Sequence, residues 1–145
     1  MEIKDFINLS LKENMEILKI RNSFKVRRWM YNSKKISYKD HKNFIKALKK
    51  SNQKYLLLKE KNRIIGSFNL KGEFIGLYQN PLLKGKGEMI LKKALDFAKQ
   101  KGLKKVYLET LYNNKRAIKL YKKTGFKEVK KLYKNARVIL FQKTL

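Results

Sequence analysis

The spacing of apolar residues predicts a strand followed by helices in the first third of the chain. Residues 3–9 read as a short strand, and the next stretch carries apolar residues at helical spacing (Leu11, Met15 and Leu18). Ser37 can cap a further helix, in which Asp40 is favoured in the first turn and one face is less polar (His41, Phe44 and Leu48).

From residue 54 onward the pattern becomes that of strands. Three apolar runs separated by short turns are typical of antiparallel strands, and they lie at residues 55–58, 63–68 and 74–78. Pro81 ends the third run before a glycine-containing loop. The rest of the chain alternates, and we expect helices at 88–101 and 114–124 with strands at 106–109, 126–132 and 138–141.

This order of elements predicts an α/β fold. We expect a single domain over residues 1–145 with a mixed, mostly antiparallel, twisted sheet of about seven strands flanked by helices. A length of 145 residues is that of one domain, and it is sufficient to bury a core.

Charge points to anionic partners. The formal net charge is +27, arginine accounts for only six of the basic residues, and lysines recur along the whole chain. Such a field concentrates polyanions, whether nucleic acid, membrane or phosphorylated metabolites. A general lysine bias on solvated faces is the alternative interpretation, because an even spread of charge marks no particular site.

The absence of cysteine narrows the chemistry. Without thiols the chain has no disulfide, thiolate metal site or cysteine nucleophile, and we expect no metal. No apolar run approaches the ~20 residues of a spanning helix, and the first residues lack the basic start and apolar stretch of a signal peptide. We therefore expect a soluble, cytoplasmic protein.

The loop Lys84-Gly85-Lys86-Gly87 is a candidate anion site. A strand precedes it and a helix follows at once, so unpaired backbone amides gather at the positive end of that helix. The glycines let the backbone approach phosphate oxygens, and the lysines add charge. A Walker or Rossmann loop is not supported, because Ile90 stands where a third glycine is needed and no GxxxxGK sequence is present. An ordinary strand-to-helix turn with exposed lysines is the alternative.

The most informative stretch is Asn114-Lys115-Arg116-Ala117-Ile118-Lys119-Leu120-Tyr121-Lys122-Lys123-Thr124-Gly125-Phe126. It resembles the closing signature NxxAIxLYxxxGF of the GNAT superfamily of N-acetyltransferases at every named position. The Gly85-x-Gly87 loop lies where that family has its acetyl-CoA loop, QxxGxG or RxxGxG, with Leu82 in place of the polar first residue. The resemblance covers nearly the whole chain in element order, and it implies a splayed central strand pair and acetyl-CoA as co-substrate.

The family resemblance also implies roles for particular residues. Tyr121 would protonate the departing thiolate, because a thiol of pKa ~8.5 leaves more easily in its protonated form. The acetyl-CoA contacts would come from Leu77, Tyr78, Leu82, Leu83, Lys84, Gly85, Lys86, Gly87, Glu88, Asn114 and Tyr121. From helical spacing alone, Tyr121 reads instead as a core tyrosine that shares a face with Ala117 and Ile118.

The attacking amine must also lose a proton. Glu109, at the end of its strand, is the best-placed carboxylate to accept this proton directly or through water, and Glu73 is the second candidate. The alternative for both is an exposed surface acid in a field of lysines.

The N-terminal half resembles one subgroup of the family. The pattern of Arg21, Trp29-Met30-Tyr31 and His41 resembles that of the PseH type. Enzymes of this type acetylate the 4-amino group of a UDP-linked 4-amino-4,6-dideoxy sugar in pseudaminic acid biosynthesis for flagellin glycosylation. The resemblance implies a nucleotide-sugar site lined by Arg21, Met30, Tyr31, His41, Phe44, Phe74 and Tyr78. Arginine and histidine can hold a diphosphate, while aromatic rings and methionine pack on a uracil and a deoxy sugar. Local packing is the alternative for His41 and Met30.

Two other functions stay open. In one, the acceptor is a ribosomal-protein N-terminus or a lysine, which predicts a groove with acidic or polar walls for an extended peptide. In the other, the chain is a nucleic-acid-binding module, although its aromatic residues fall mostly at core-spaced strand positions and no recognition motif is present. We expect no membrane and no dedicated nucleic-acid partner, and a homodimer through the final strand is compatible with the pattern.

Overall fold

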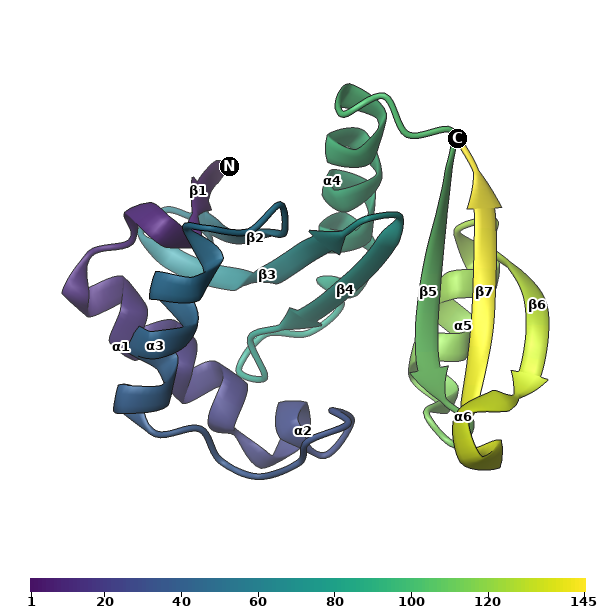
Figure 1. The fold of residues 1–145 in the computed structure, drawn as a ribbon, viewed down its shortest axis with the longest axis horizontal. Helices are drawn as coiled ribbons and strands as arrows, with labels where there is room; N and C mark the ends of the chain where they lie inside the picture. The colour runs from purple at the N-terminus through teal and green to yellow at the C-terminus, as the bar shows by residue number, and fades with distance from the viewer.

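The computed structural model describes residues 1–145, apart from the side chain of Leu132, and Figure 1 shows the order of its elements. The strands are β1 (Glu2–Asp5), β2 (Lys54–Glu60), β3 (Arg63–Lys71), β4 (Phe74–Gln79), β5 (Lys105–Leu111), β6 (Lys127–Leu132) and β7 (Val138–Thr144). The helical elements are η1 (Phe6–Asn8), α1 (Leu11–Asn22), α2 (Phe24–Arg27), α3 (Tyr38–Leu48), α4 (Gly87–Gln100), α5 (Lys115–Lys123) and α6 (Tyr133–Ala136). Across the described residues, every helix is too short or too polar to cross a membrane.

The seven strands form one sheet in the order β1-β2-β3-β4-β5-β7-β6. Neighbouring strands are antiparallel except β4 and β5, which are parallel. The predicted α/β fold with a mixed, mostly antiparallel sheet is therefore confirmed. The final strand is not the exposed strand that the homodimer hypothesis needed, because the hairpin places β7 between β5 and β6 and leaves β6 at the edge.

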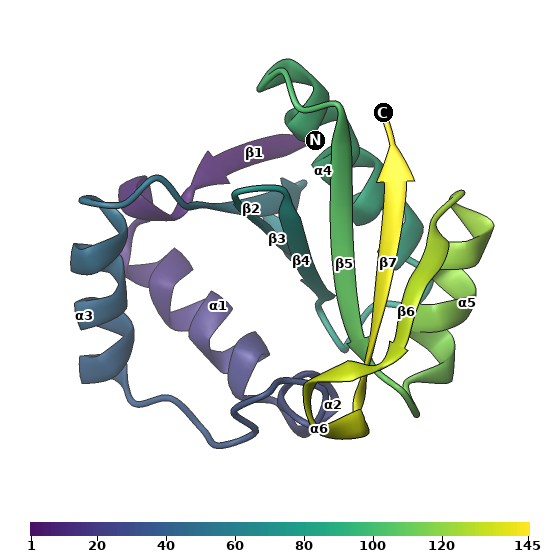
Figure 2. The same cartoon turned by 45° about the vertical axis from the view of Figure 1, so that its right-hand side comes forward.

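Two apolar clusters hold helices against opposite faces of this sheet. In β2, Leu56 and Leu58 belong to the cluster that contains α4 and α5, whereas Leu57 belongs to the cluster of α1, α2 and α3. Consecutive side chains of a strand point to opposite faces, so one strand serves both clusters. Figures 1 and 2 show α1 and α3 on one side of β2 and β3, and α4 on the other.

The opening segment differs from its prediction in two ways. The expected strand over residues 3–9 ends at Asp5, whose Oδ1 accepts a hydrogen bond from the Ile7 amide at 3.1 Å and starts a 3-10 turn. In α1 the predicted apolar face is partly wrong, since Leu11 and Met15 are 67% and 51% exposed. The buried residues of α1 are instead Glu13, Ile17, Leu18 and Ile20. The Glu13 carboxylate can be buried because it forms ion pairs with Lys4 and Lys59.

Candidate active site

The parallel strands β4 and β5 meet at one end only. Phe74 and Tyr107 form their single register pair, and the Tyr107 amide donates to the Glu73 carbonyl at 2.9 Å. The two rings stack with centroids 5.3 Å apart. Figure 1 shows the strands separating toward their C-terminal ends. Beyond this pair, the edge of β4 next to β5 has no strand partner, in agreement with the splayed pair that the family resemblance implies.

A cavity of about 2110 Å³ opens between the diverging strands. Its walls come from β4, β5, the loop before α4 and α5 on one side, and from α1, α3 and the segment after α2 on the other. Among the residues predicted for the site, Leu82 and Lys86 lie outside the lining, and Leu82 is 82% exposed. The predicted residues that line it are Arg21, Met30, Tyr31, His41, Phe44, Phe74, Leu77, Tyr78, Leu83, Lys84, Gly85, Gly87, Glu88, Glu109, Asn114 and Tyr121.

The glycine-containing loop is braced by Gln79, the last residue of β4. The side-chain oxygen of Gln79 accepts a hydrogen bond from the Lys86 amide at 3.1 Å, and its Nε2 donates to the Leu83 carbonyl at 2.8 Å. Gly85 adopts a left-handed backbone with φ 67°, which side chains disfavour. The shape of this loop therefore depends on one side chain of β4 and on one glycine.

The loop leads into the first turn of α4, where backbone amides have no carbonyl partner within the helix. Among the hydrogen bonds of the described residues, none uses the amides of Gly87, Glu88 or Met89. A Cβ at Gly87 would lie 3.1 Å from Leu120 Cδ2, so glycine also lets α5 pack against this end of α4. The free amides and the helix dipole together suit an anionic ligand such as a pyrophosphate.

Tyr121 lies on α5 between the core and the cavity. It is 7% exposed, and its ring packs on Phe126 and Phe141 with centroid distances of 6.1 and 5.6 Å. Burial raises the pKa of Tyr121 to about 12. No hydrogen bond to its hydroxyl occurs among the described residues, and the side chain lines the cavity. The phenol therefore stays protonated at neutral pH and can donate to a group in the cavity.

Glu109, on β5, is paired with a lysine from α6. Lys134 Nζ lies 2.8 Å from Oε2 and 3.1 Å from Oε1 of Glu109, whose side chain is 14% exposed. Lys134 also lies 5.7 Å from the ring centroid of Tyr31, which follows α2. This contact connects the two walls of the cavity. Desolvation, and then the neighbouring Glu109 carboxylate, raise the pKa of Tyr31. Glu73 lies at the closed end of the splay, outside the cavity lining.

The opposite wall is shaped by α1. Arg21 Nη2 donates to the Asn32 carbonyl at 3.1 Å, and Asn22 makes two hydrogen bonds of 2.8 Å with the backbone of Ile36. These bonds hold the segment that carries Tyr31. Arg21 Nη1 is buried and has no hydrogen-bond partner among the described residues, and burial lowers the pKa of Arg21. Because a buried donor without a partner is unfavourable, Arg21 is suited to an anionic group in the cavity.

Three other predicted residues of this wall are partly or wholly packed. Met30 and Phe44 pack against the α1–α3 cluster, and the Phe44 ring meets Tyr55 edge-on at 4.9 Å. His41 is 7% exposed, with Nε2 2.8 Å from Asn14 Oδ1, and burial lowers its pKa. Core packing therefore accounts for part of the burial of these residues, although all three also line the cavity.

The cavity is strongly basic. Its two carboxylates are already paired, Glu88 with Lys123 at 3.1 Å and Glu109 with Lys134. Hydrogen bonds and the charges of Lys123 and Lys92 lower the pKa of Glu88. Such a cavity favours anionic substrates over a basic peptide. The ten basic residues of the lining are Arg21, Lys25, Arg28, Lys71, Lys84, Lys115, Arg116, Lys119, Lys123 and Lys134.

Sequence reasoning missed several of these residues. Gln79 belongs to no motif that the sequence shows. Lys134 contacts Glu109 although the two residues are 25 positions apart in the chain. A row on α5 was readable in principle, because Lys115, Lys119 and Lys123 recur at every fourth position of one helix.

The match to protein families bears directly on this cavity. The acetyltransferase (GNAT) family matches residues 16–126, a span that includes the loop before α4, Glu109 and Tyr121. The chain belongs to the GNAT family. This GNAT protein is an acyltransferase, an N-acetyltransferase with acetyl-CoA as its acetyl donor. The family implied by the signature on α5 is thereby confirmed.

Similar proteins support the same assignment. An acetyltransferase PseH of Campylobacter jejuni subsp. jejuni serotype O:23/36 is 31% identical over 134 residues, which cover 87% of this GNAT chain and 84% of the relative. The crystal structure of Campylobacter jejuni N-acetyltransferase PseH with acetyl coenzyme A has a TM-score of 0.80 at 21% identity, covering 99% and 97% of the two chains. A spermidine N-acetyltransferase from Vibrio cholerae has a TM-score of 0.84 at 18% identity, covering 99% and 94%. At these identities the structural likenesses show the fold.

Proposed function

We propose that this GNAT enzyme acetylates the 4-amino group of a UDP-linked 4-amino-4,6-dideoxy sugar, as in pseudaminic acid biosynthesis for flagellin glycosylation. The observation that carries the proposal is the basic cavity, in which Arg21, with its unpartnered Nη1, shares one space with the loop before α4. The similarity to acetyltransferase PseH supports the sugar acceptor. We expect the enzyme to act in the cytoplasm.

The donor side of the cavity is suited to acetyl-CoA. The free amides at the start of α4 and the backbone of Gly85 and Gly87 would hold the pyrophosphate. The open edge of β4 at Leu77 and Tyr78 would bind the pantetheine arm. Asn114 caps α5, where its Oδ1 accepts a hydrogen bond from the Ala117 amide at 3.3 Å, and it lines the cavity as well.

The reaction joins these two sides. The acceptor amine attacks the acetyl carbonyl carbon, so a C–N bond forms and the C–S bond breaks. Glu109 takes the proton that the amine loses, directly or through a water, and Tyr121 gives its phenolic proton to the leaving sulfur. The raised pKa of Tyr121, about 12, ensures that the proton is present at the start of each turnover.

The acceptor side would hold the sugar nucleotide. Arg21 supplies a buried, unpartnered donor for the diphosphate. Apolar and aromatic surfaces for the uracil and the deoxy sugar are available from Met30, Tyr31, Phe44, Phe74 and Tyr78. Neither carboxylate of the cavity is without a lysine partner, which disfavours a basic N-terminal peptide as acceptor.

Release of thiol from acetyl-CoA tests the proposal. Purified enzyme is given the UDP-linked 4-amino sugar or a basic N-terminal peptide, and Tyr121→Phe is compared with the wild type. We expect turnover with the sugar alone, and a kcat about 10²–10⁴-fold lower in the variant, which is the usual contribution of general acid catalysis. Stability should change little because the Tyr121 hydroxyl makes no hydrogen bond with the described residues.

Tyr107→Phe is the matched control, because it removes the same hydroxyl from a tyrosine of β5 that does not line the cavity. Its kcat should equal that of the wild type. Turnover with the peptide alone would reject the sugar acceptor, and an unchanged kcat in Tyr121→Phe would reject the acid.

A further inference from the structure

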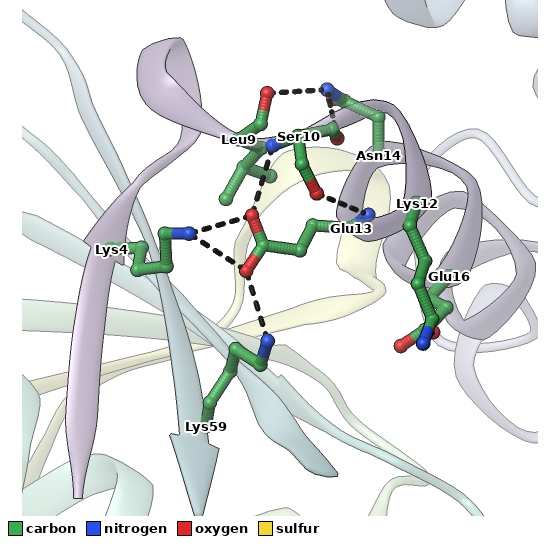
Figure 3. A network of polar contacts seen from close by, with 8 residues as sticks. All are labelled: Lys4, Leu9, Ser10, Lys12, Glu13, Asn14, Glu16 and Lys59. Atoms are coloured by element: carbon green, nitrogen blue, oxygen red, sulfur yellow. Dashed lines mark hydrogen bonds and ion pairs between the residues drawn. The ribbon is translucent and has the colours of Figure 1, made fainter. Parts of the chain in front are cut away.

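The neighbours of His41 determine which of its ring nitrogens carries a proton. Asn14 Nδ2 donates to the carbonyls of Leu9 at 3.3 Å and Ser10 at 3.0 Å, as Figure 3 shows. The reverse orientation of the amide would place an oxygen against two carbonyl oxygens. Asn14 Oδ1 is therefore the atom that faces His41, and Nε2 of His41, 2.8 Å away, must be an N–H donor.

In the neutral ring the other nitrogen, Nδ1, then holds a lone pair. No hydrogen bond to Nδ1 occurs among the described residues, and Nδ1 is not one of their buried polar atoms without a partner. His41 lines the cavity, and Nδ1 is its ring nitrogen without a hydrogen-bond partner among the described residues. A lone pair on this wall attracts a hydrogen-bond donor and repels a phosphate oxygen.

The surroundings of His41 favour the neutral ring. Burial lowers its pKa from the ordinary value of 6.5, so the ring is uncharged at pH 7. The cavity-lining ionisable groups on the elements packed beside it are Arg21 on α1 and Tyr55 on β2, and η1 contributes the apolar Phe6. The cation of Arg21 disfavours a positive charge on His41, and the neutral phenol of Tyr55 does not stabilise one.

We infer that His41 Nδ1 accepts a hydrogen bond from a hydroxyl or N–H group of the acceptor substrate and does not hold its diphosphate. The inference deepens the proposed function, and the identity of the acceptor rests on that function. His41 then acts as a specificity-determining residue, because its lone pair favours a substrate with a donor at this point. The anionic part of the substrate is left to Arg21, whose Nη1 is the unpartnered donor of the same wall.

Nuclear magnetic resonance tests the tautomer without any substrate. The chain has one histidine, so two-bond ¹H–¹⁵N correlations of the imidazole belong to His41. We expect the neutral Nε2–H tautomer at pH 7, and a mixture of tautomers in Asn14→Ala. Asn43→Ala is the matched control, because Asn43 is exposed on α3, and its spectrum should equal the wild type. An Nδ1–H tautomer or an imidazolium at pH 7 in the wild type would overturn the inference.

Binding of the acetylated product tests the role toward the substrate. The product is the UDP-linked 4-acetamido sugar, whose amide does not titrate as the acceptor amine does. As the pH falls through the pKa of His41, Nδ1 gains a proton and the hydrogen bond is lost, and we expect the Kd of the product to rise to a plateau about tenfold higher.

The sign of this change separates the two roles of His41. A Kd that falls or stays constant toward low pH would mean that His41 binds the diphosphate or nothing, and would reject the inference. If the product does not bind at any pH, the proposed acceptor is wrong, and the tautomer spectrum alone decides the state of His41. The two failures are therefore distinguishable.

Discussion

The burial of Glu13 predicts a large and pH-dependent contribution to stability. Figure 3 shows its carboxylate between Lys4, with Nζ at 2.8 and 2.9 Å, Lys59 at 3.0 Å and the Ser10 amide at 2.9 Å. This carboxylate joins α1 to β1 and β2. The same helix carries Arg21 to the cavity and Asn14 to His41, so its anchoring also matters for the site.

The magnitude follows from the pKa of Glu13. Burial opposes the charged form, but hydrogen bonds from Lys4, Ser10 and Lys59 outweigh it and lower the pKa from 4.5 to about 2. A difference of 2.5 pKa units, 4.5 minus 2, corresponds to about 3 kcal/mol in the free energy of unfolding. Because the Lys4 side chain is 31% exposed, screening by water reduces the expected contribution to about 2–3 kcal/mol.

The sign of the pH dependence is also determined. The pKa of Glu13 is lower in the folded than in the unfolded chain, so the ionised carboxylate stabilises the folded state. The contribution is complete above pH 4.5 and is lost as the pH falls from 4.5 toward 2. At pH 3 about 1 kcal/mol should remain.

Urea unfolding of wild type and Glu13→Gln, followed by circular dichroism between pH 7 and pH 3, measures this contribution. Glutamine keeps the size of the side chain and an acceptor for the Ser10 amide, but it leaves two lysines unpaired. Glu16→Gln is the matched control, because Glu16 lies on the same helix with only Lys12 at 4.0 Å, and we expect a change under about 0.5 kcal/mol. A Glu13→Gln variant within 0.5 kcal/mol of the wild type at pH 7, or a difference that does not shrink toward pH 3, would refute the reasoning.

Two further predictions concern the cavity. Gln79→Leu removes two hydrogen bonds from the loop before α4. Each bond contributes about 0.5–1.5 kcal/mol, so we expect the KM for acetyl-CoA to rise about fivefold or more in steady-state kinetics. The exposed Gln100→Leu serves as its control, and an equal KM in the two variants would contradict the bracing role. Asn114→Ala removes the cap of α5 and should lower the free energy of unfolding by about 1 kcal/mol. Asn114→Ser should keep most of the stabilisation, because serine can also cap a helix. Equal denaturation midpoints for those two variants would show that the cap contributes nothing.

The sequence by itself determined the features that depend on neighbours in the chain. Ser37 was readable as a cap because its side chain bonds the Asp40 amide three residues away, at 3.1 Å. The buried stripe of α4 follows helical spacing, and Ile90, Ala94 and Ala98 are all buried. The signature around Tyr121 was equally local, which is why the family could be identified.

Only the tertiary structure decided which distant residues meet. Glu13 and Lys59 are 46 residues apart, His41 and Asn14 are 27 apart, and Glu109 and Lys134 are 25 apart. These contacts set the burial of a carboxylate, the tautomer of a histidine and the partner of the proposed base. They depend on the order of strands in the sheet and on the packing of α1 against it. Helical and strand periodicity report which face of an element is apolar, and they do not report which other element that face will meet.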